Sequence, residues 1–258
     1  MFEAREYIRW RIKAHGKAGV HPPFLFRLVD EVLTEKNTVS MVPQIETLRK
    51  KLLKDRHVIQ VTDLGAGSKT GAARERSIRD IARHAAKSEK WGKTLARLAA
   101  EIQPNHLIEL GTSLGISAAY LASAVPKSTL ITLEGCPAIA SEARKNIDML
   151  EIENIEIRTG HFDQTLPALL DELTSVDFAY VDGNHTEEAT LRYFEWLKSK
   201  SHKHTVLVFD DIHWSAGMAE AWKKITADSR VTLSVDFFRI GVVFFDSRFS
   251  KQHFNLVI

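Results

Sequence analysis

Residues 107–117 read L-I-E-L-G-T-S-L-G-I-S, an apolar strand that ends in an acid and turns through two glycines into a helix. Gly111 and Gly115 bracket this turn, where the missing Cβ lets a ligand approach the backbone and the helix N-terminus can face its polar end. A nicotinamide dinucleotide site would have the spacing G-x-G-x-x-G, whereas this turn has G-x-x-x-G. A glycine pair alone is a weak signal, so the prediction depends on the segments that follow.

Strands alternate with helices from residue 105 onward. We expect strands at 107–110, 129–134, 155–158, 177–182 and 205–210, separated by helices near 115–125, 137–150, 164–174, 186–200 and 215–227. This alternation of apolar strands with helices predicts a parallel sheet with both faces covered. Strands 231–238 and 241–246 are joined by so short a link that only a hairpin is possible, which makes the last strand antiparallel.

Polar residues follow the next two strands at the same edge of the predicted sheet. Ser113 and Ser117 add hydroxyl groups to the first turn, and the second strand ends in Glu134, which is placed to accept hydrogen bonds from ribose hydroxyls. The third strand leads into G-H-F-D at 160–163, where Asp163 is positioned for an adenine amine. This ordered series predicts that residues 107–117 hold the cofactor.

A second glycine motif, V-T-D-L-G-A-G-S-K-T-G at 61–71, competes for that role. A phosphate-binding loop needs G-x-x-x-x-G-K-[ST], and here Asp63 and Ser68 occupy both glycine positions. No second strand with a terminal acid follows about 20 residues later, as a nucleotide fold requires. We interpret this motif as a turn in the N-terminal region or as a wall of the acceptor pocket.

The chain of 258 residues has a formal net charge of +2, but the charge is unevenly distributed. Residues 1–100 hold 21 Lys and Arg against 11 Asp and Glu, and the remainder is acidic. We expect residues 1–104 to form a helical cap, with helices at 2–15, 24–36, 43–55 and 73–101, and residues 105–258 to form the cofactor domain. The basic cap either docks on the acidic domain or attracts an anionic acceptor or nucleic acid. Strand-length apolar runs, an N-terminus without an apolar h-region and a single Cys136 predict a cytoplasmic protein.

Residues 105–246 resemble a class I S-adenosylmethionine-dependent methyltransferase, a family with a Rossmann-like seven-stranded sheet and an antiparallel last strand. E-L-G-T-S-L-G-I-S, Y-V-D-G-N-H and D-D-I-H-W-S together resemble the small-molecule O-methyltransferases similar to catechol O-methyltransferase, and H-P-P-F and D-L-G-A-G-S are similar to a bacterial branch of them. The resemblance implies that the methionine part is held by Glu109, Gly111, Thr112, Ser113, Gly115 and Ser117, the ribose by Glu134 with Gly135, the adenine by His161, Phe162 and Asp163, and that Asp182 also lies at the cofactor.

Acids follow the fourth and fifth strands, at Asp182 and at the pair Asp210 and Asp211. Carboxylates on adjacent strand ends repel one another unless a cation such as Mg²⁺ neutralises them. Metal-dependent relatives have an acid after the fourth strand and an Asp-Asp or Asp-Asn pair after the fifth, so the resemblance implies Asp182, Asp210 and Asp211 as Mg²⁺ ligands. The alternative is that Asp182 only binds substrate and that Asp211 caps the following helix.

His185 is our candidate general base, with Asp182 as its catalytic neighbour. It occupies the position where the catechol-type family has a basic catalytic residue, Asn184 beside it cannot take a proton, and an imidazole with a pKa near ~6.5 suits the role. The alternative is a histidine that only positions substrate, and His213 is the second candidate.

The sequence therefore predicts an enzyme that methylates a hydroxyl of a small-molecule acceptor, with Mg²⁺ assistance implied by the resemblance. One alternative is a methyltransferase for RNA or another nucleic acid that uses the basic cap; another is a cofactor-binding interaction protein without catalysis. The charge asymmetry would serve a contact between two copies of the chain as well as one within it.

Overall fold

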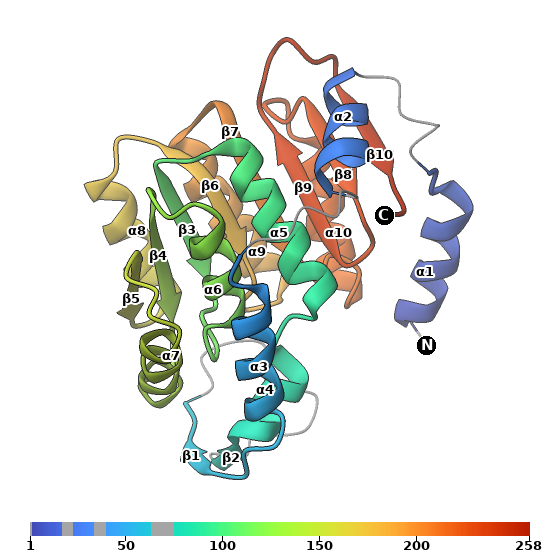
Figure 1. The fold of residues 1–258 in the computed structure, drawn as a ribbon. Helices are drawn as coiled ribbons and strands as arrows, with labels where there is room; N and C mark the ends of the chain where they lie inside the picture. The colour runs from blue at the N-terminus through green and yellow to red at the C-terminus, as the bar shows by residue number, and fades with distance from the viewer. Residues whose placement is uncertain (1, 17–22, 34–39, 63–74) are drawn as a thin grey trace. The chain divides into compact units, whose positions relative to one another are not determined.

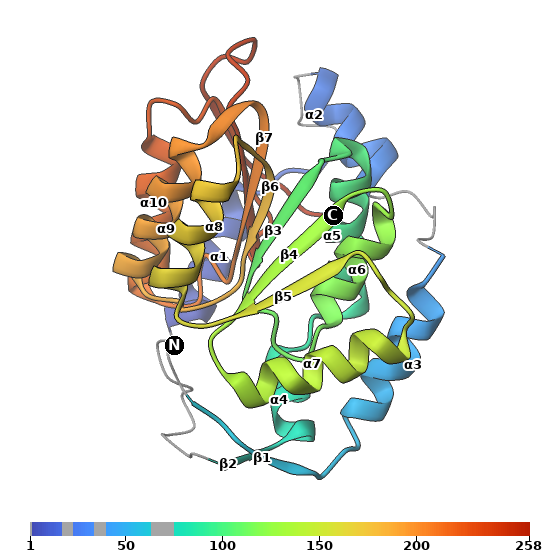
Figure 2. The same cartoon turned by 90° about the vertical axis from the view of Figure 1, so that its left-hand side faces the viewer.

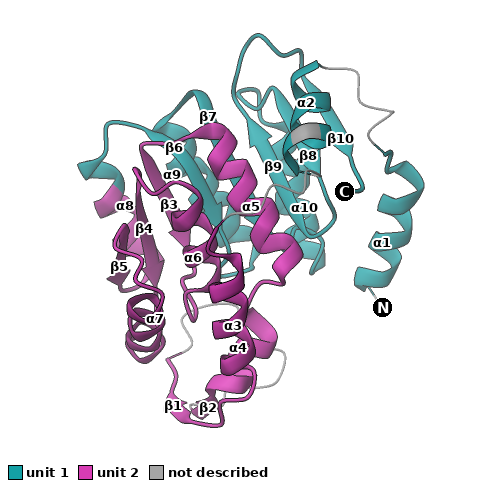
Figure 3. Cartoon of the chain, viewed as in Figure 1, with its two compact units in different colours: residues 1–36, 170–258 teal, residues 37–169 magenta. Residues whose placement is uncertain are grey.

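The computed structural model describes residues 2–16, 23–33, 40–62 and 75–258, which fall into two compact units (Figures 1 and 3). Unit 1 comprises residues 1–36 and 170–258, and unit 2 comprises residues 37–169. The predicted division into 1–104 and 105–258 follows a different boundary and stays a prediction. The glycine motif at 61–71 lies outside the described residues apart from its first two positions, and so does His21-Pro22 of the H-P-P-F segment.

Unit 2 contains a parallel three-stranded part of the main sheet with helices around it (Figure 2). Its elements are α3 (Val42–Leu52), β1 (Val58–Gln60), β2 (Glu75–Ser77), α4 (Ile78–Ala85), α5 (Glu89–Ile102), β3 (His106–Leu110), α6 (Ile116–Ala124), β4 (Thr129–Glu134), α7 (Pro137–Met149) and β5 (Ile155–Thr159). The next helix, α8 (Phe162–Glu172), begins at the end of this unit. The register pairs Leu110 with Leu133 and Glu134 with Thr159, so these strands end at one edge.

Unit 1 contains the antiparallel part of the main sheet, in the order β10-β8-β9-β7-β6. Its elements are α1 (Phe2–Lys13), α2 (Pro23–Arg27), the π-helix η2 (Leu28–Leu33), β6 (Val176–Val181), α9 (Glu187–Ser199), β7 (Ser201–Asp210), α10 (Ala216–Ala227), β8 (Leu233–Asp236), β9 (Ile240–Phe244) and β10 (Gln252–Asn255). Strand β9 is antiparallel to both β7 and β8, whereas β6 is parallel to β7. Consequently β6, β7 and β8 all end at the same edge.

The predicted α/β fold with a closing antiparallel hairpin is confirmed. The main sheet has eight strands rather than the seven of the family pattern, because β10 adds a parallel edge strand beside β8. We did not predict this strand because its sequence, Q-H-F-N, is polar and has no apolar run. The predicted helix 73–101 is wrong in detail: it comprises β2, α4 and α5, because Ser77 caps α4 through Asp80 and the backbone is extended at Ala86.

The S-H-K-H segment that we expected to be a solvated loop is the first part of β7. Its backbone is held because His202 Nε2 contacts Asp177 Oδ1 at 2.8 Å and the N–H of His202 donates to Thr205 Oγ1 at 2.9 Å. Because this segment is polar, we expected the strand to start at 205, which is four residues after its observed start at Ser201. Among the described residues, no helix has the length and apolar content needed to cross a membrane.

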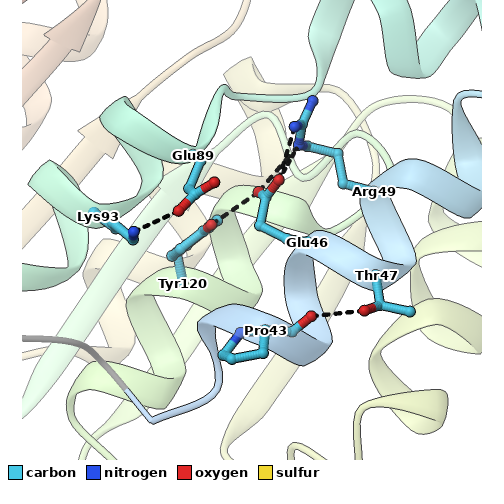
Figure 4. A network of polar contacts seen from close by, with 7 residues as sticks. All are labelled: Pro43, Glu46, Thr47, Arg49, Glu89, Lys93 and Tyr120. Atoms are coloured by element: carbon cyan, nitrogen blue, oxygen red, sulfur yellow. Dashed lines mark hydrogen bonds and ion pairs between the residues drawn. The ribbon is translucent and has the colours of Figure 1, made fainter.

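A buried polar network joins the N-terminal helices of unit 2 to α6 (Figure 4). The hydroxyl of Tyr120 on α6 donates to Glu46 Oε1 at 2.9 Å, and Arg49 Nε donates to both carboxylate oxygens of Glu46. Apolar side chains of α3, α4 and α6, among them Ile45 and Ile81, pack around it as one core cluster. Burial raises the pKa of Tyr120, so the phenol stays protonated and remains the donor. The helices before β3 are thereby fixed to the helix that follows the glycine turn.

Replacing Gly92 with alanine is expected to destabilise unit 2. A Cβ at this position would lie 2.9 Å from Tyr120 Cγ and closer still to two other ring atoms, and that ring is fully buried. Alanine gains about 0.5–1 kcal/mol of helix propensity, but forced overpacking costs about 1–3 kcal/mol. We expect a net loss of roughly 1–2 kcal/mol, measured by urea unfolding.

Gly16→Ala is the matched control, because nothing lies within 4 Å of a Cβ there. A Gly92→Ala protein as stable as the wild type would contradict this close contact between α5 and α6.

Candidate active site

The turn after β3 has three residues in the left-handed backbone region. Gly111, Ser113 and Gly115 have φ angles of 102°, 49° and 84°. The amides of Gly111 and Thr112 donate to the carbonyl of Leu133 on β4, which ties the turn to the neighbouring strand. Gly115 is the N-cap of α6, so the helix begins within the glycine turn. A left-handed N-cap favours glycine, which explains why the G-x-x-x-G spacing builds this turn.

The carboxylate of Glu134, at the end of β4, accepts hydrogen bonds from a backbone amide of the turn after β3 and from one at the start of α7. Its Oε2 accepts from the amide of Ser113 at 2.9 Å, and its Oε1 accepts from the amide of Cys136 at 2.9 Å. The side chain is 9% exposed, and burial raises its pKa although these backbone donors lower it. The backbone of Gly135 is a third donor to this carboxylate, and because a carboxylate has about four acceptor sites, Glu134 can still accept from a ligand's hydroxyl.

Hydrogen bonds between buried side chains connect the turn to β3 and β4. Thr132 Oγ1 donates to Glu109 Oε2 at 2.6 Å and lies 2.6 Å from Thr112 Oγ1. All three side chains are fully buried, as 0% exposed residues. Asn146 on α7 adds a hydrogen bond of 3.0 Å to the carbonyl of Leu114. Thr132 and Asn146 were not predicted, because a threonine in a strand and an asparagine in a helix carry no distinguishing sequence signal.

The segment after β5 lies beside the same edge. The amide of Gly160 donates to the carbonyl of Glu134 at 2.9 Å, and Gly160 has a φ of 151°. His161 Nδ1 accepts from the amide of Asp163 at 3.1 Å, which orients the imidazole at the start of α8. These contacts bring the third strand end next to Glu134. The predicted methionine, ribose and adenine residues of unit 2 therefore lie on consecutive strand ends of one unit, while their roles stay predictions.

Asp182 and His185 lie together after β6 in unit 1. Asp182 Oδ2 accepts from the hydroxyl of Tyr180 at 3.0 Å, and His185 Nε2 lies 3.5 Å from Asp182 Oδ1. Asn184 has a left-handed φ of 50°, and Thr186 caps α9, so His185 is held between a turn and a helix start. The imidazole is 24% exposed. A carboxylate beside a partly exposed imidazole can stabilise its protonated form.

The acid pair Asp210 and Asp211 lies at the end of β7, as predicted, and its metal-binding role stays a prediction. Asp210 is 2% exposed, and Asp211 has a left-handed φ of 50°. Arg239 Nη1 lies 3.5 Å from Asp211 Oδ1 and 3.0 Å from Glu3 Oε1, so a cation of the chain already faces this carboxylate. Within the described ranges, no group of three His, Cys, Asp or Glu side chains is arranged to hold a metal ion. Mg²⁺ binding by Asp182, Asp210 and Asp211 stays a prediction, and the chemistry proposed for this chain does not depend on a metal.

Comparison with known proteins gives the family. A family model described as "Methyltransferase domain" matches residues 108–212. A catechol O-methyltransferase of Niastella koreensis is 36% identical over 128 residues, which cover 48% of this chain and 57% of that protein. A catechol O-methyltransferase of Mycobacterium tuberculosis is 30% identical over 151 residues, covering 57% of this chain and 67% of that protein. The chain belongs to the class I S-adenosylmethionine-dependent O-methyltransferases.

A solved structure of this O-methyltransferase fold has the same architecture. The O-methyltransferase from Bacillus cereus in complex with SAH is 22% identical, with a TM-score of 0.56 over 84% of this chain and 96% of that one. Because the chain spans only 57% of the length of one of its curated relatives, the acceptor of this O-methyltransferase is inferred from its own residues.

Proposed function

We propose that the chain transfers the methyl group of S-adenosylmethionine to a hydroxyl of a small-molecule acceptor. The observation that carries the proposal is Glu134, whose buried carboxylate joins the turn after β3 to the start of α7 and can accept ribose hydroxyls. The left-handed turn at Gly111 to Gly115 would hold the methionine part, and His161 to Asp163 the adenine. The two catechol O-methyltransferases among its relatives support a small acceptor.

The chemistry that we propose for unit 1 is proton removal by His185. Methyl transfer is an in-line displacement: the acceptor oxygen forms a bond to the methyl carbon, the sulfur–methyl bond breaks, and the hydroxyl proton goes to a base. The carboxylate of Asp182, 3.5 Å away, would stabilise the imidazolium that forms. Asp182 at the cofactor, Mg²⁺ assistance, a cytoplasmic location and pairing of two copies stay predictions.

Nucleic acid as the acceptor is not favoured. Several basic side chains of the first hundred residues pair with acids of the same region, such as Arg49 with Glu46 and Lys93 with Glu89. These pairs support the interpretation that the basic helices serve packing within the protein. A binding protein without catalysis is the other alternative, and the pair of His185 and Asp182 argues against it.

A methyl-transfer assay tests the proposal. Purified protein is incubated with S-adenosylmethionine carrying a radioactive methyl group and a panel of hydroxylated small molecules that includes catechol, with Mg²⁺ or with a chelator. Turnover of at least one acceptor supports the proposal, and loss of that turnover with chelator would support the predicted Mg²⁺ assistance. Cofactor binding without turnover of any acceptor would favour the binding protein, and methylation of added RNA alone would favour the nucleic-acid alternative.

Cofactor affinity is expected to fall as the pH is lowered from about pH 8 to about pH 5. Burial raises the pKa of Glu134, so this carboxyl takes up its proton at a higher pH than an exposed glutamate. The protonated form loses a hydrogen-bond acceptor that the ribose needs. The stability of the fold changes in the opposite direction. Because the pKa of Glu134 is raised in the folded protein, deprotonating this carboxyl lowers the free energy of unfolding as the pH rises.

The pH dependence is measured as the dissociation constant of S-adenosylmethionine at each pH. His161→Gln is the control, since it removes the neighbouring imidazole of the proposed adenine pocket while Glu134 is kept. An affinity that does not change across this range in either protein would contradict a ribose contact through the Glu134 carboxylate.

A further inference from the structure

Among the described residues of unit 1, His185, His202 and His213 lie close to aspartates, and His213 differs from His202. His202 Nε2 contacts Asp177 Oδ1 at 2.8 Å, and its other nitrogen, Nδ1, accepts from the amide of His204 at 3.1 Å. His213 Nε2 contacts Asp236 Oδ2 at 2.7 Å. Its Nδ1 is buried and has no hydrogen-bond partner in the described part of the chain. The same kind of pair is therefore complete at His202 and incomplete at His213.

The partners of Asp236 determine which nitrogen of His213 carries the proton. Asp236 is 3% exposed, and its Oδ2 also accepts from the indole N–H of Trp222 at 3.2 Å. Its Oδ1 accepts from the amide of Phe238 at 2.7 Å. A carboxylate surrounded by donors only accepts, so Nε2 of His213 carries the hydrogen and donates it. In the neutral ring, Nδ1 is then an unprotonated acceptor.

The ring of His213 is held rigidly in this orientation. It stacks on Phe238 with ring centroids 5.1 Å apart and an interplanar angle of 12°. Phe238 has a left-handed φ of 69° and also contacts Tyr7 and Trp10 of α1. The indole N–H of Trp10 donates to the carbonyl of Asp236 at 3.1 Å. The contact with Phe238, which is itself packed against α1, thus fixes where Nδ1 lies.

The location of His213 connects it with the reaction. It follows β7, Asp236 ends β8, and Asp182 follows β6, so all three lie at the edge where these strands end. His202 and Asp177 lie instead at the starts of β7 and β6. Trp214, next to His213, lies 5.9 Å from the ring of His185, measured between ring centroids. A buried acceptor without a donor is unfavourable, and a ligand that supplies a donor removes that cost.

We propose that His213, held through Nε2 by Asp236, binds the methyl acceptor by accepting a hydrogen bond at Nδ1. This inference rests on the proposed function and adds a second acceptor-binding histidine to His185. His185 takes the proton of the reacting hydroxyl, and His213 orients the acceptor through another of its N–H or O–H groups. Neither role involves the cofactor loop of unit 2.

His213→Gln tests the proposal, because the glutamine amide can still donate to Asp236 while its geometry cannot reproduce the acceptor at Nδ1. We expect the melting temperature and the affinity for S-adenosylmethionine to stay near the wild-type values. With the hydroxylated molecule that the wild type methylates fastest, kcat/KM should fall about tenfold or more, mainly through a higher KM for that molecule.

His202→Gln is the matched control, since it alters a histidine–aspartate pair of the same kind at the opposite edge, and it should leave kcat/KM unchanged. A His213→Gln protein with kcat/KM within twofold of the wild type would overturn the proposal and show that His213 only fills the site beside Asp236. An equal loss in His202→Gln would overturn it as well. A wild-type protein that binds the cofactor but methylates no molecule of the panel would instead contradict the proposed function itself.

Discussion

Replacing Glu134 with alanine is expected to weaken the binding of S-adenosylmethionine about 100-fold. The substitution removes the buried acceptor of the Ser113 and Cys136 amides as well as the proposed ribose contact. A hydrogen bond to a charged group contributes about 1.5–3 kcal/mol. Losing two such bonds corresponds to a rise of about 100-fold or more in the dissociation constant. Equilibrium dialysis with labelled S-adenosylmethionine measures the change.

Glutamine at position 134 should be nearly as damaging as alanine. Both carboxylate oxygens accept from backbone amides, and a glutamine must turn its NH₂ group toward one of these two donors. Glu156→Ala is the matched control, because Glu156 lies on the neighbouring strand β5 with a side chain that is 50% exposed. Affinity within threefold of the wild type in both Glu134 variants would show that the turn and the ribose do not depend on this carboxylate.

Replacing His185 with glutamine is expected to lower kcat for methyl transfer by about 10²–10⁴ while leaving cofactor affinity unchanged. General-base catalysis typically contributes a factor of this size, and glutamine cannot take up the proton. The affinity should be preserved because the proposed contacts to the methionine, ribose and adenine parts of the cofactor do not include His185. Single-turnover kinetics with a saturating acceptor separates this chemical step from binding.

Asp182→Asn provides the companion measurement for His185. It keeps a side chain of the same shape beside the imidazole but removes the charge that would stabilise its protonated form. We expect a smaller loss of kcat than in His185→Gln. Full activity in His185→Gln would contradict its assignment as the base. An equal loss of cofactor binding in that variant would show instead that the histidine serves the cofactor pocket.

The fold was largely predictable because its strands carry continuous apolar runs that end in acids and glycines. The turn at 107–117 and the strand-end position of Glu134 follow from that pattern, and the structure places them at one edge. Strand β10 was missed because Q-H-F-N has no apolar run, and its burial depends on pairing with β8. β2 was missed for a similar reason, since a three-residue strand carries too little pattern to be recognised.

The candidate site was predictable only where a residue's role follows from its own position. Glu134 and His185 were located from the sequence because each follows directly from a strand end, while their roles stay predictions. Asp236 was missed although it ends β8 at the same edge, because D-F-F reads as part of an apolar strand in the hairpin. The ion pair of Arg239 with Asp211 joins two segments separated in sequence, so no local pattern indicated that this carboxylate already faces a cation.

Calorimetric titration of S-adenosylmethionine into the full chain tests the central claim most directly. We expect saturable binding at one site, with a dissociation constant below about 1 mM, the upper end of ordinary enzyme–substrate affinities. Binding should be retained in Glu156→Ala and lost at the same concentrations in Glu134→Ala. No heat of binding in the wild-type protein at several times that concentration would contradict the assignment of the cofactor to the strand ends of unit 2.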